Sequence, residues 1–215
     1  MTRTSPDHES PDDLPLGEGV LAKPSLRAEG LARRDALAPD VREEAARRLV
    51  RTLLALPELA GVGPIAGYWP LRSELDPRPA LAALAERGHR IALPVVSEPS
   101  LVFRAWTPGT PLVRGPFGVE APGPEAEVLH PRALLVPLAR FDRACHRIGY
   151  GKGHYDRALA ALERAGPVIA IGVAFSVQEA QTIPAEDHDR RLDLVVTEAE
   201  IVRAPHRAAG AAREA

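Results

Sequence analysis

The sequence predicts a Rossmann-like α/β fold, a three-layer sandwich with a mainly parallel sheet. Segments with helical spacing of apolar residues alternate along the chain with short apolar runs typical of strands. Three runs, 133–139, 168–175 and 192–197, are almost wholly apolar, as expected of parallel strands buried on both faces. With 215 residues, 45% of them hydrophobic, the chain can fill the core of one such domain.

Two helices are expected before the sheet, over 24–37 and 39–56. Pro57 ends the second one, because proline cannot continue a helix. At helical spacing, the second helix carries an apolar face made of Val41, Ala45, Leu49, Leu53 and Leu56.

The sheet is expected to begin with a βαβ unit. PIAGYW (64–69) is its first strand and RIALPVV (90–96) its second. Between them, Asp76 and Pro77 form an N-cap and first-turn pair for a helix over 77–87. The order of these segments predicts two parallel neighbouring strands.

The second half of the chain continues the alternation. LVFRAW (101–106) alternates like a strand on one face of a sheet, and 107–131 is predicted to be irregular because it is rich in proline and glycine. After the strand at 133–139, HYDRALAALERAGP (154–167) has helical spacing, and VQEAQ (177–181) is interpreted as a short helical segment.

The domain boundaries follow from composition. Residues 1–22 are rich in proline and acid with no hydrophobic period, so we expect a disordered extension. Residues 23–203 are expected to form a single catalytic domain, and 204–215 a frayed tail.

Charge and cysteine content exclude several function classes. The formal net charge of -2 lacks the basic excess of proteins that bind nucleic acid through its phosphates. The single cysteine, Cys145, excludes an internal disulfide and a zinc site built on several thiolates. Because the chain has neither a signal peptide nor an apolar run long enough to span a membrane, we expect a cytoplasmic protein. We also expect a monomer.

The most informative segment is RIGYGKGHYDRAL (147–159), which lies between a buried strand and a helix. Glycines at 149, 151 and 153 allow backbone N–H groups to turn toward one point, and the following helix adds positive charge at its N-terminus. Lys152 adds a full charge, so the segment is suited to bind a phosphate. On spacing alone, a plain glycine-rich turn is an equal alternative, because the pattern is neither a dinucleotide fingerprint nor a P-loop.

Residues 147–157 read R-x-G-Y-G-x-G-x-Y-D-R, which resembles the signature of 5-formyltetrahydrofolate cyclo-ligases, also called methenyltetrahydrofolate synthetases. The resemblance extends over 23–202 and includes KPSLR, GYWPLRSELD, GPFGVEAP and HDRRLDLVVTE in the expected order. It implies the α/β sandwich of that family, and closure of 5-formyltetrahydrofolate to 5,10-methenyltetrahydrofolate with ATP as co-substrate and Mg²⁺ as cofactor. The partners would be ATP and a reduced folate.

The resemblance also implies where ATP binds. Phosphoryl transfer needs positioning and charge neutralisation, so cations are expected on the phosphates, with Arg147 and Lys152 as the catalytic ones. The ATP-binding set would be Lys23, Arg27, Arg147, Gly149, Tyr150, Gly151, Lys152, Gly153, His154 and Tyr155. Without the resemblance, the same cations would be solvated charges on helices and loops.

Two acids match the metal-binding acids of the family, Asp156 and Asp189. Mg²⁺ keeps several waters, so one or two carboxylates suffice. The alternative role of Asp156 is to favour a helix N-terminus, and that of Asp189 is to cap a turn. The metal role is favoured for Asp156, and less so for Asp189 because Asp187 and Asp193 are alternatives nearby.

For the folate, the resemblance implies that Glu74 accepts hydrogen bonds from substrate nitrogens. Aromatic residues would offer flat surface to the rings. For Phe117 and Trp106, ordinary core packing is an equal alternative. The substrate-binding set would be Arg27, Trp69, Glu74, Trp106, His154 and Tyr155.

Three positions depart from the pattern of the family. His154 stands where an aromatic residue is usual, Cys145 where glycine is frequent, and Ala121 in place of a glutamate, with Glu120 beside it. These departures motivate one alternative, a non-catalytic paralogue that binds nucleotide or folate. A second alternative is an α/β enzyme acting on a phosphorylated sugar or acyl thioester, which would not consume ATP.

Overall fold

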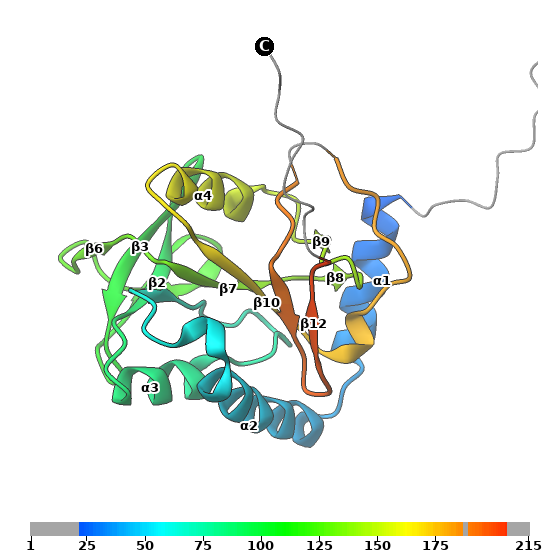
Figure 1. Ribbon diagram of the computed structural model, residues 1–215, viewed down its shortest axis with the longest axis horizontal. Coiled ribbons are helices and arrows are strands. Elements are labelled where there is room, and N and C mark those ends of the chain that lie inside the picture. Colours follow the sequence, from blue (N-terminus) through cyan, green and yellow to red (C-terminus); the bar gives the residue numbers. More distant parts are fainter. Residues whose placement is uncertain (1–21, 187–188, 206–215) are drawn as a thin grey trace, which may run out of the picture.

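The computed structural model describes residues 22–186 and 189–205, so the predicted extension lies outside the described residues except for Ala22, as does most of the predicted tail. Its main sheet has eight strands in the spatial order β12-β11-β10-β7-β1-β2-β3-β6 (Figure 1). These strands are β1 Ile65–Ala66, β2 Ile91–Ser97, β3 Ser100–Trp106, β6 Val128–Leu129, β7 Ala133–Pro137, β10 Ile169–Val173, β11 Leu194–Val196 and β12 Ile201–Arg203.

The centre of the sheet is parallel and its edges are antiparallel. β2, β1, β7, β10 and β11 run in the same direction, with pairs such as Ile65 opposite Ile91 and Ile169 opposite Ala133. β3 and β6 extend one edge antiparallel, and β12 extends the other. The predicted mainly parallel sheet and its βαβ unit are therefore confirmed.

Helices cover both faces of this sheet. Their bounds are α1 Lys23–Asp35, α2 Pro39–Ala55, α3 Arg78–Glu86 and α4 His154–Glu163, with single 3₁₀ turns η1 Pro57–Leu59, η2 Pro116–Gly118 and η3 Ser176–Gln178. In Figure 1, α2 and α3 lie below the sheet and α4 above it. The predicted three layers are present, and the segment expected to be helical at 177–181 is only the short turn η3.

Alternating side chains of the buried strands build two cores, one on each side of the sheet. In β7, Ala133 and Leu135 pack in the core with α2 and α3, whereas Leu134 and Val136 pack in the core with α4. Because both faces of the strand are covered, an unbroken apolar run is required there. This explains the apolar strand segments of the sequence.

The predicted apolar face of α2 is mostly confirmed, with one error. Leu49 is fully buried in the core, but Val41 is 45% exposed. We expect Leu49→Ala to lower the free energy of unfolding by about 2–5 kcal/mol, because it leaves a cavity that the sheet cannot fill. Val41→Ala, on the same helix, is the matched control and should cost less than about 0.5 kcal/mol. Urea unfolding of both variants tests this, and equal losses would contradict the assigned packing.

Other sequence predictions need correction. α3 begins at Arg78 rather than Pro77, so its N-cap is Pro77 and not the predicted Asp76. The Asp76 carboxylate accepts a hydrogen bond from the backbone N–H of Arg78 at 2.9 Å. The segment 107–131 is not wholly irregular, because it holds β6 and the short pair β4 (Val113–Arg114) and β5 (Glu120–Ala121). Two-residue strands carry too little pattern to be recognised in a sequence.

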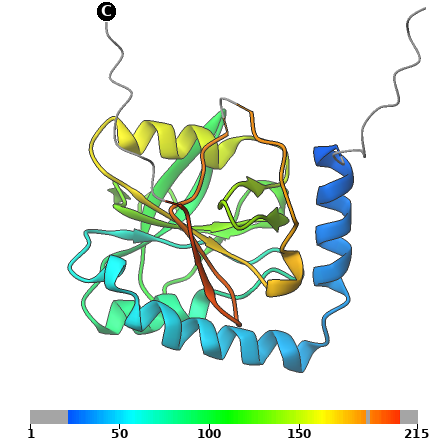
Figure 2. The ribbon, with the colours of Figure 1, turned by 45° about the vertical axis from the view of Figure 1, so that its right-hand side comes forward.

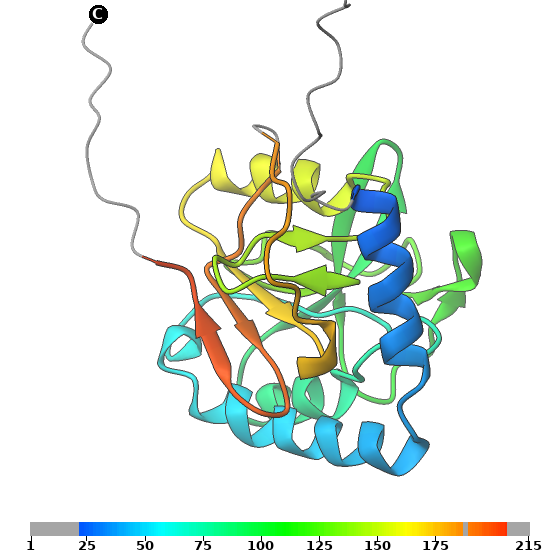
Figure 3. The same cartoon turned by 90° about the vertical axis from the view of Figure 1, so that its right-hand side faces the viewer.

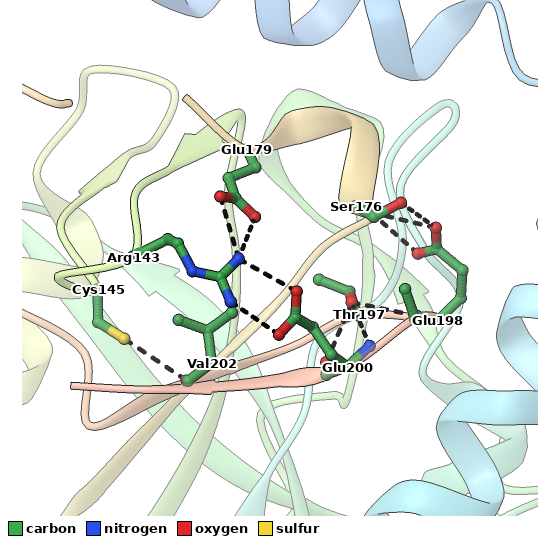
Figure 4. Close-up of polar contacts among 9 residues, drawn as sticks. Arg143, Cys145, Ser176, Glu179, Thr197, Glu198, Glu200 and Val202 are labelled. Atoms are coloured by element: carbon green, nitrogen blue, oxygen red, sulfur yellow. Dashed lines mark hydrogen bonds and ion pairs between the residues drawn. The ribbon is translucent and has the colours of Figure 1, made fainter. Parts of the chain in front are cut away.

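A second small sheet, absent from the predictions, leads into the glycine segment. It is the hairpin of β8 (Arg140–Phe141) and β9 (Arg147–Ile148). At its turn, Arg143 donates hydrogen bonds to Glu179, at the end of η3, and to Glu200, before β12 (Figure 4). These exposed pairs join the turn to two distant segments of the chain.

Helix α1 stands at one side of the molecule, next to this hairpin. Figures 2 and 3 show α1 alongside β8 and β9, and it also contacts η3. Gly30 allows the close approach, since a Cβ there would lie 2.2 Å from the carbonyl oxygen of Ala139. The described residues contain no helix that is both long and apolar enough to cross a membrane.

Candidate active site

A cavity of about 1050 Å³ lies at the carboxyl ends of the parallel strands. Its wall includes Trp69 after β1, Val96 in β2 and Pro137 at the end of β7. This is the edge where open α/β sheets bind ligands, and the volume is at the upper end of the usual range for small-molecule sites, roughly 300–1,000 Å³. Among the predicted site residues, those that line the cavity are Lys23, Arg27, Trp69, Glu74, Arg147, Gly149, Tyr150, Gly151, Lys152, Gly153, His154, Tyr155, Asp156 and Asp189.

The glycine loop, Gly149–Gly153, forms one wall between β9 and α4. Gly151 has φ +86° and Gly153 has φ +66°, a region that side-chain-bearing residues adopt at a cost. Gly149 has no such φ, and a Cβ there would meet nothing within 4 Å. Two of the three glycines are therefore required by backbone conformation.

Gly153 is also the N-cap of α4, and no side chain caps this end of the helix. The first N–H groups of any helix lack an intrahelical partner, and the residues of the first turn of α4, His154, Tyr155 and Asp156, line the cavity. Such an N-terminus favours a negatively charged ligand.

Helix α1 brings two cations to the glycine loop and its surroundings. The Arg27 Nε donates a 2.6 Å hydrogen bond to the Gly149 carbonyl oxygen. Lys23 Nζ lies 2.6 Å from Asp189 Oδ2 and 2.8 Å from Glu186 Oε1. Burial lowers the pKa of Lys23, but the hydrogen bonds to Asp189 and Glu186 outweigh burial and raise it above the ordinary value.

Arg147, in β9 before the glycine loop, and Asp156, in α4 after it, form an ion pair. Arg147 Nη2 lies 2.7 Å from Asp156 Oδ1, and the side chain of Arg147 is only 6% exposed. The same carboxylate oxygen accepts the backbone N–H of Arg190, and Arg147 Nη1 donates to the Arg190 carbonyl oxygen. Asp156 thus joins the first turn of α4 to the segment that carries Asp189.

Asp156 and Asp189, the two acids predicted to bind a metal ion, both line this part of the cavity, and so does Glu186. The side chains of Asp156 and Asp189 are 28% and 27% exposed. The described residues contain no cluster of three or more metal-ligating side chains, so any ion held here would take the remaining ligands from water or a bound substrate. Asp193 instead accepts the Ala170 N–H at 2.7 Å and supports the strands, and Asp187 lies outside the described residues.

Glu74 lies in the loop after β1 with its side chain 4% exposed. Its Oε2 accepts the Leu71 N–H at 2.8 Å, and its Oε1 accepts the Tyr150 hydroxyl at 2.8 Å. Burial raises the pKa of Glu74, and these two hydrogen bonds and the Arg34 charge oppose part of the increase. Tyr150, predicted for the nucleotide, therefore bonds to the residue predicted for the folate.

Trp69 lines the cavity, whereas Trp106 does not and is a residue of the core. Trp106 packs edge-on against Trp69, with ring centroids 6.0 Å apart and an interplanar angle of 79°. The guanidinium of Arg78 lies 4.9 Å from the centroid of the Trp69 ring. Trp106 therefore supports Trp69 rather than offering its own face to a ligand, contrary to its predicted role.

The positions that depart from the family pattern have distinct surroundings. His154 Nε2 lies 3.4 Å from Glu98 Oε1, on the turn between β2 and β3. Ala121 lines the cavity, whereas Glu120 is exposed and outside its lining. Cys145 has φ +63°, which explains a preference for glycine at this position.

The Cys145 thiol is fully buried and donates weakly to the Val202 carbonyl oxygen at 3.6 Å (Figure 4). Burial raises its pKa to about 11. A thiol that stays protonated is a poor nucleophile. The side chain of Phe117 lies outside the described part of the structure.

The sequence interpretation missed several residues of the site. Tyr68 and Arg190 line the cavity, and Arg34 contacts Glu74 from behind it. A signal for Arg34 was present, because Lys23, Arg27 and Arg34 are spaced 4 and 7 residues apart and so share one side of a helix. The predicted set therefore omitted Tyr68, Arg190 and Arg34, although most of its members line the cavity.

Comparison with known proteins agrees with the fold. The 5-formyltetrahydrofolate cyclo-ligase family matches residues 20–198. The 5-formyltetrahydrofolate cyclo-ligase of Mycolicibacterium smegmatis is 33% identical over 82% of this chain and 93% of its own length, and that of Escherichia coli K12 is 29% identical over 79% and 96%.

The solved structures agree as well. The 5,10-methenyltetrahydrofolate synthetase of Aquifex aeolicus superposes with a TM-score of 0.75 at 27% identity, over 89% of this chain and 97% of that one. The corresponding enzyme of Mycoplasma pneumoniae gives 0.67 at 26% identity, over 83% and 99%. The family match spans most of the chain, and the chain therefore belongs to the 5-formyltetrahydrofolate cyclo-ligase family.

Proposed function

We propose that this protein closes 5-formyltetrahydrofolate to 5,10-methenyltetrahydrofolate at the expense of ATP, releasing ADP and phosphate. The observation that carries the proposal is that the glycine loop, the cations of α1 and the Glu74 carboxylate line the same cavity at the sheet edge. These groups come from segments distant in the sequence, and neither a nucleotide nor a folate alone needs all of them.

The chemistry requires both ligands in one place. The formyl oxygen is a poor leaving group, so the γ-phosphoryl group of ATP is transferred to it and ADP forms. The second folate nitrogen then attacks the activated carbon and forms the new C–N bond, while the C–O bond breaks and phosphate leaves with the oxygen. The proton on the attacking nitrogen passes to solvent.

The phosphates are proposed to lie against the glycine loop and the N-terminus of α4. The turned backbone at Gly151 and Gly153 and the uncapped helix supply N–H donors, and Arg27 and Lys152 line the same wall. Charge neutralisation and positioning of this kind provide most of the catalysis of phosphoryl transfer.

The donor set also fits Mg²⁺, held by Asp156 and Asp189. Both carboxylates line the cavity and are partly exposed, and hard oxygen ligands of this number suit an ion that keeps several waters and binds substrate phosphates. The ion supplies neutralisation of phosphate charge when bound. Lys23 and Arg147 form ion pairs with Asp189 and Asp156, and so hold these carboxylates in place at the cavity.

The folate is proposed to lie between Trp69 and Glu74. The Trp69 ring is held from the core side by Trp106 and offers flat apolar area to the pterin. Glu74 accepts hydrogen bonds from pterin nitrogens with the lone pairs that Tyr150 and Leu71 leave available.

The direct test mixes purified protein with 5-formyltetrahydrofolate, ATP and Mg²⁺ and follows the near-ultraviolet absorbance of the methenyl product. We expect product only when ATP and Mg²⁺ are both present, with one ADP formed per product. Binding of ATP by folded protein without any product would favour the non-catalytic paralogue instead.

A further inference from the structure

Arg34, on α1, has a buried charge that the cavity itself does not explain. Its side chain is 1% exposed and it does not line the cavity, unlike Lys23 and Arg27 on the same helix. A charged side chain is almost never buried to this extent unless its hydrogen bonds are satisfied. The partners of Arg34 therefore indicate why the chain keeps it.

The donors of Arg34 have defined acceptors. Its Nε donates to the Ser73 hydroxyl oxygen at 3.0 Å, and its Nη1 donates to the Tyr150 hydroxyl oxygen at 3.1 Å. The Ser73 hydroxyl donates in turn to Asp35, and the Tyr150 hydroxyl to Glu74 Oε1. The loop that carries Glu74 and the glycine loop are thus both attached to one guanidinium.

The direction of each hydrogen bond follows from the chemistry of arginine. A guanidinium has only donors, so the Tyr150 oxygen must accept from Arg34 and its proton is left for Glu74. Glu74 Oε1 is then an acceptor, and Oε2 already accepts the Leu71 N–H. A protonated Glu74 would have to donate through one of these oxygens, so the network favours the ionised carboxylate.

We propose that Arg34 is a positioning residue: it fixes the Tyr150 hydroxyl as a donor to Glu74 and thereby holds that carboxylate ionised and oriented toward the substrate nitrogens. The contact of Glu74 with substrate nitrogens rests on the proposed function. The network of Arg34, Tyr150 and Glu74 does not depend on that function.

The other titratable side chains that face Glu74 are tyrosines, so Arg34 is the positive charge beside this carboxylate. Tyr68, after β1, and Tyr155, on α4, both lie close enough to interact with the Glu74 charge, and burial raises the pKa of each above its ordinary value. Burial also raises the pKa of Tyr150, to about 12. These tyrosines stay neutral near neutral pH, whereas the guanidinium lies 3.9 Å from Glu74 Oε1.

Arg34→Met tests the proposal, with Arg33→Met as its matched control. Arg33 is the adjacent residue, 50% exposed, and pairs with Glu29 instead. Without Arg34, the Tyr150 hydroxyl oxygen can accept a hydrogen bond from a protonated Glu74, so the pKa of Glu74 rises. We expect this pKa to increase by about one unit or more, because an opposite charge within ~4–6 Å shifts a carboxyl by roughly 1–3 units. Arg33→Met should leave it unchanged.

The primary measurement is ¹³C NMR titration of protein labelled at glutamate side-chain carboxyls, with the Glu74 signal assigned by its loss in Glu74→Gln. In turnover assays, the rise of kcat/KM with pH should move to higher pH by the same amount in Arg34→Met. An unchanged Glu74 titration in Arg34→Met would overturn the proposal, even if the wild-type protein makes the methenyl product. Absence of product in the wild type would instead overturn the proposed function and leave the titration result standing.

Tyr150→Phe keeps the test decisive if Arg34→Met does not fold. Tyr150 is 39% exposed, so removal of its hydroxyl should leave the fold intact. In Tyr150→Phe, the Glu74 carboxylate loses a hydrogen bond that stabilises its ionised form, so the pKa of Glu74 should again rise. A pKa of Glu74 equal to that of the wild type in Tyr150→Phe would show that the hydroxyl does not transmit the effect of Arg34.

Discussion

Gly151→Val is expected to abolish ATP-dependent formation of the methenyl product while the protein stays folded. Gly151 has φ +86°, which a β-branched residue adopts only with strain, and a Cβ there would lie 3.3 Å from Arg27 Nη2. The loop must therefore change its course or displace Arg27. We expect turnover to fall about a hundredfold or more, which corresponds to roughly 2.7 kcal/mol of lost transition-state stabilisation.

Gly149→Ala is the matched control for this prediction. It adds a side chain two residues away in the same loop, where no atom lies within 4 Å and φ is not left-handed. Its turnover should stay within about threefold of the wild type, and circular dichroism should show native folding for both variants. Normal turnover of Gly151→Val would mean that the loop is only a turn and does not approach the phosphates.

The layers of this fold could be predicted from the sequence because burial on both faces imposes an apolar run. That requirement identified β7 and β10, and helical periodicity identified α2 and α4. Periodicity gives the direction of a side chain but not the extent of the layer that covers it. For this reason Leu49 was placed correctly in the core, whereas Val41, on the same face, is exposed.

Short and polar elements could not be predicted in the same way. The hairpin of β8 and β9 has two residues in each strand, and the Arg140 and Arg147 side chains within it are buried, although arginine suggests a surface position. The hairpin packs against α1, and Phe141 forms a β-bridge with Glu179, directly after η3; a local sequence pattern does not encode these contacts.

Most of the predicted site residues line one cavity. Those at 147–156 belong to one contiguous motif, whereas Lys23, Arg27, Trp69 and Glu74 lie far from it in the sequence and were predicted from the family resemblance. Trp106 was misplaced, since a sequence does not tell which of two neighbouring tryptophans faces the ligand and which supports it. Arg34 was missed for a related reason: its role depends on hydrogen bonds to Ser73 and Tyr150, residues 39 and 116 positions away.

Asp156→Asn is expected to raise the Mg²⁺ concentration needed for half-maximal turnover by about tenfold or more. Asparagine keeps an oxygen for the Arg147 guanidinium and the Arg190 N–H, so the geometry around the first turn of α4 should survive. What it loses is the negative charge that a hard cation prefers in a ligand. A tenfold change corresponds to about 1.4 kcal/mol of binding free energy.

The same substitution leaves the nearly buried Arg147 without an ionised partner, so a lower melting temperature is also expected. Asp193→Asn separates the two effects. Asp193 accepts a backbone N–H of β10 and does not line the cavity. Asparagine still accepts this hydrogen bond but without the charge that strengthens it, so the variant should lose stability without any change in Mg²⁺ dependence. Turnover measured against Mg²⁺ at saturating ATP, together with thermal unfolding, distinguishes the outcomes. If both variants keep the wild-type Mg²⁺ dependence, Asp156 serves the helix and Arg147 alone, and the ion is bound elsewhere in the cavity.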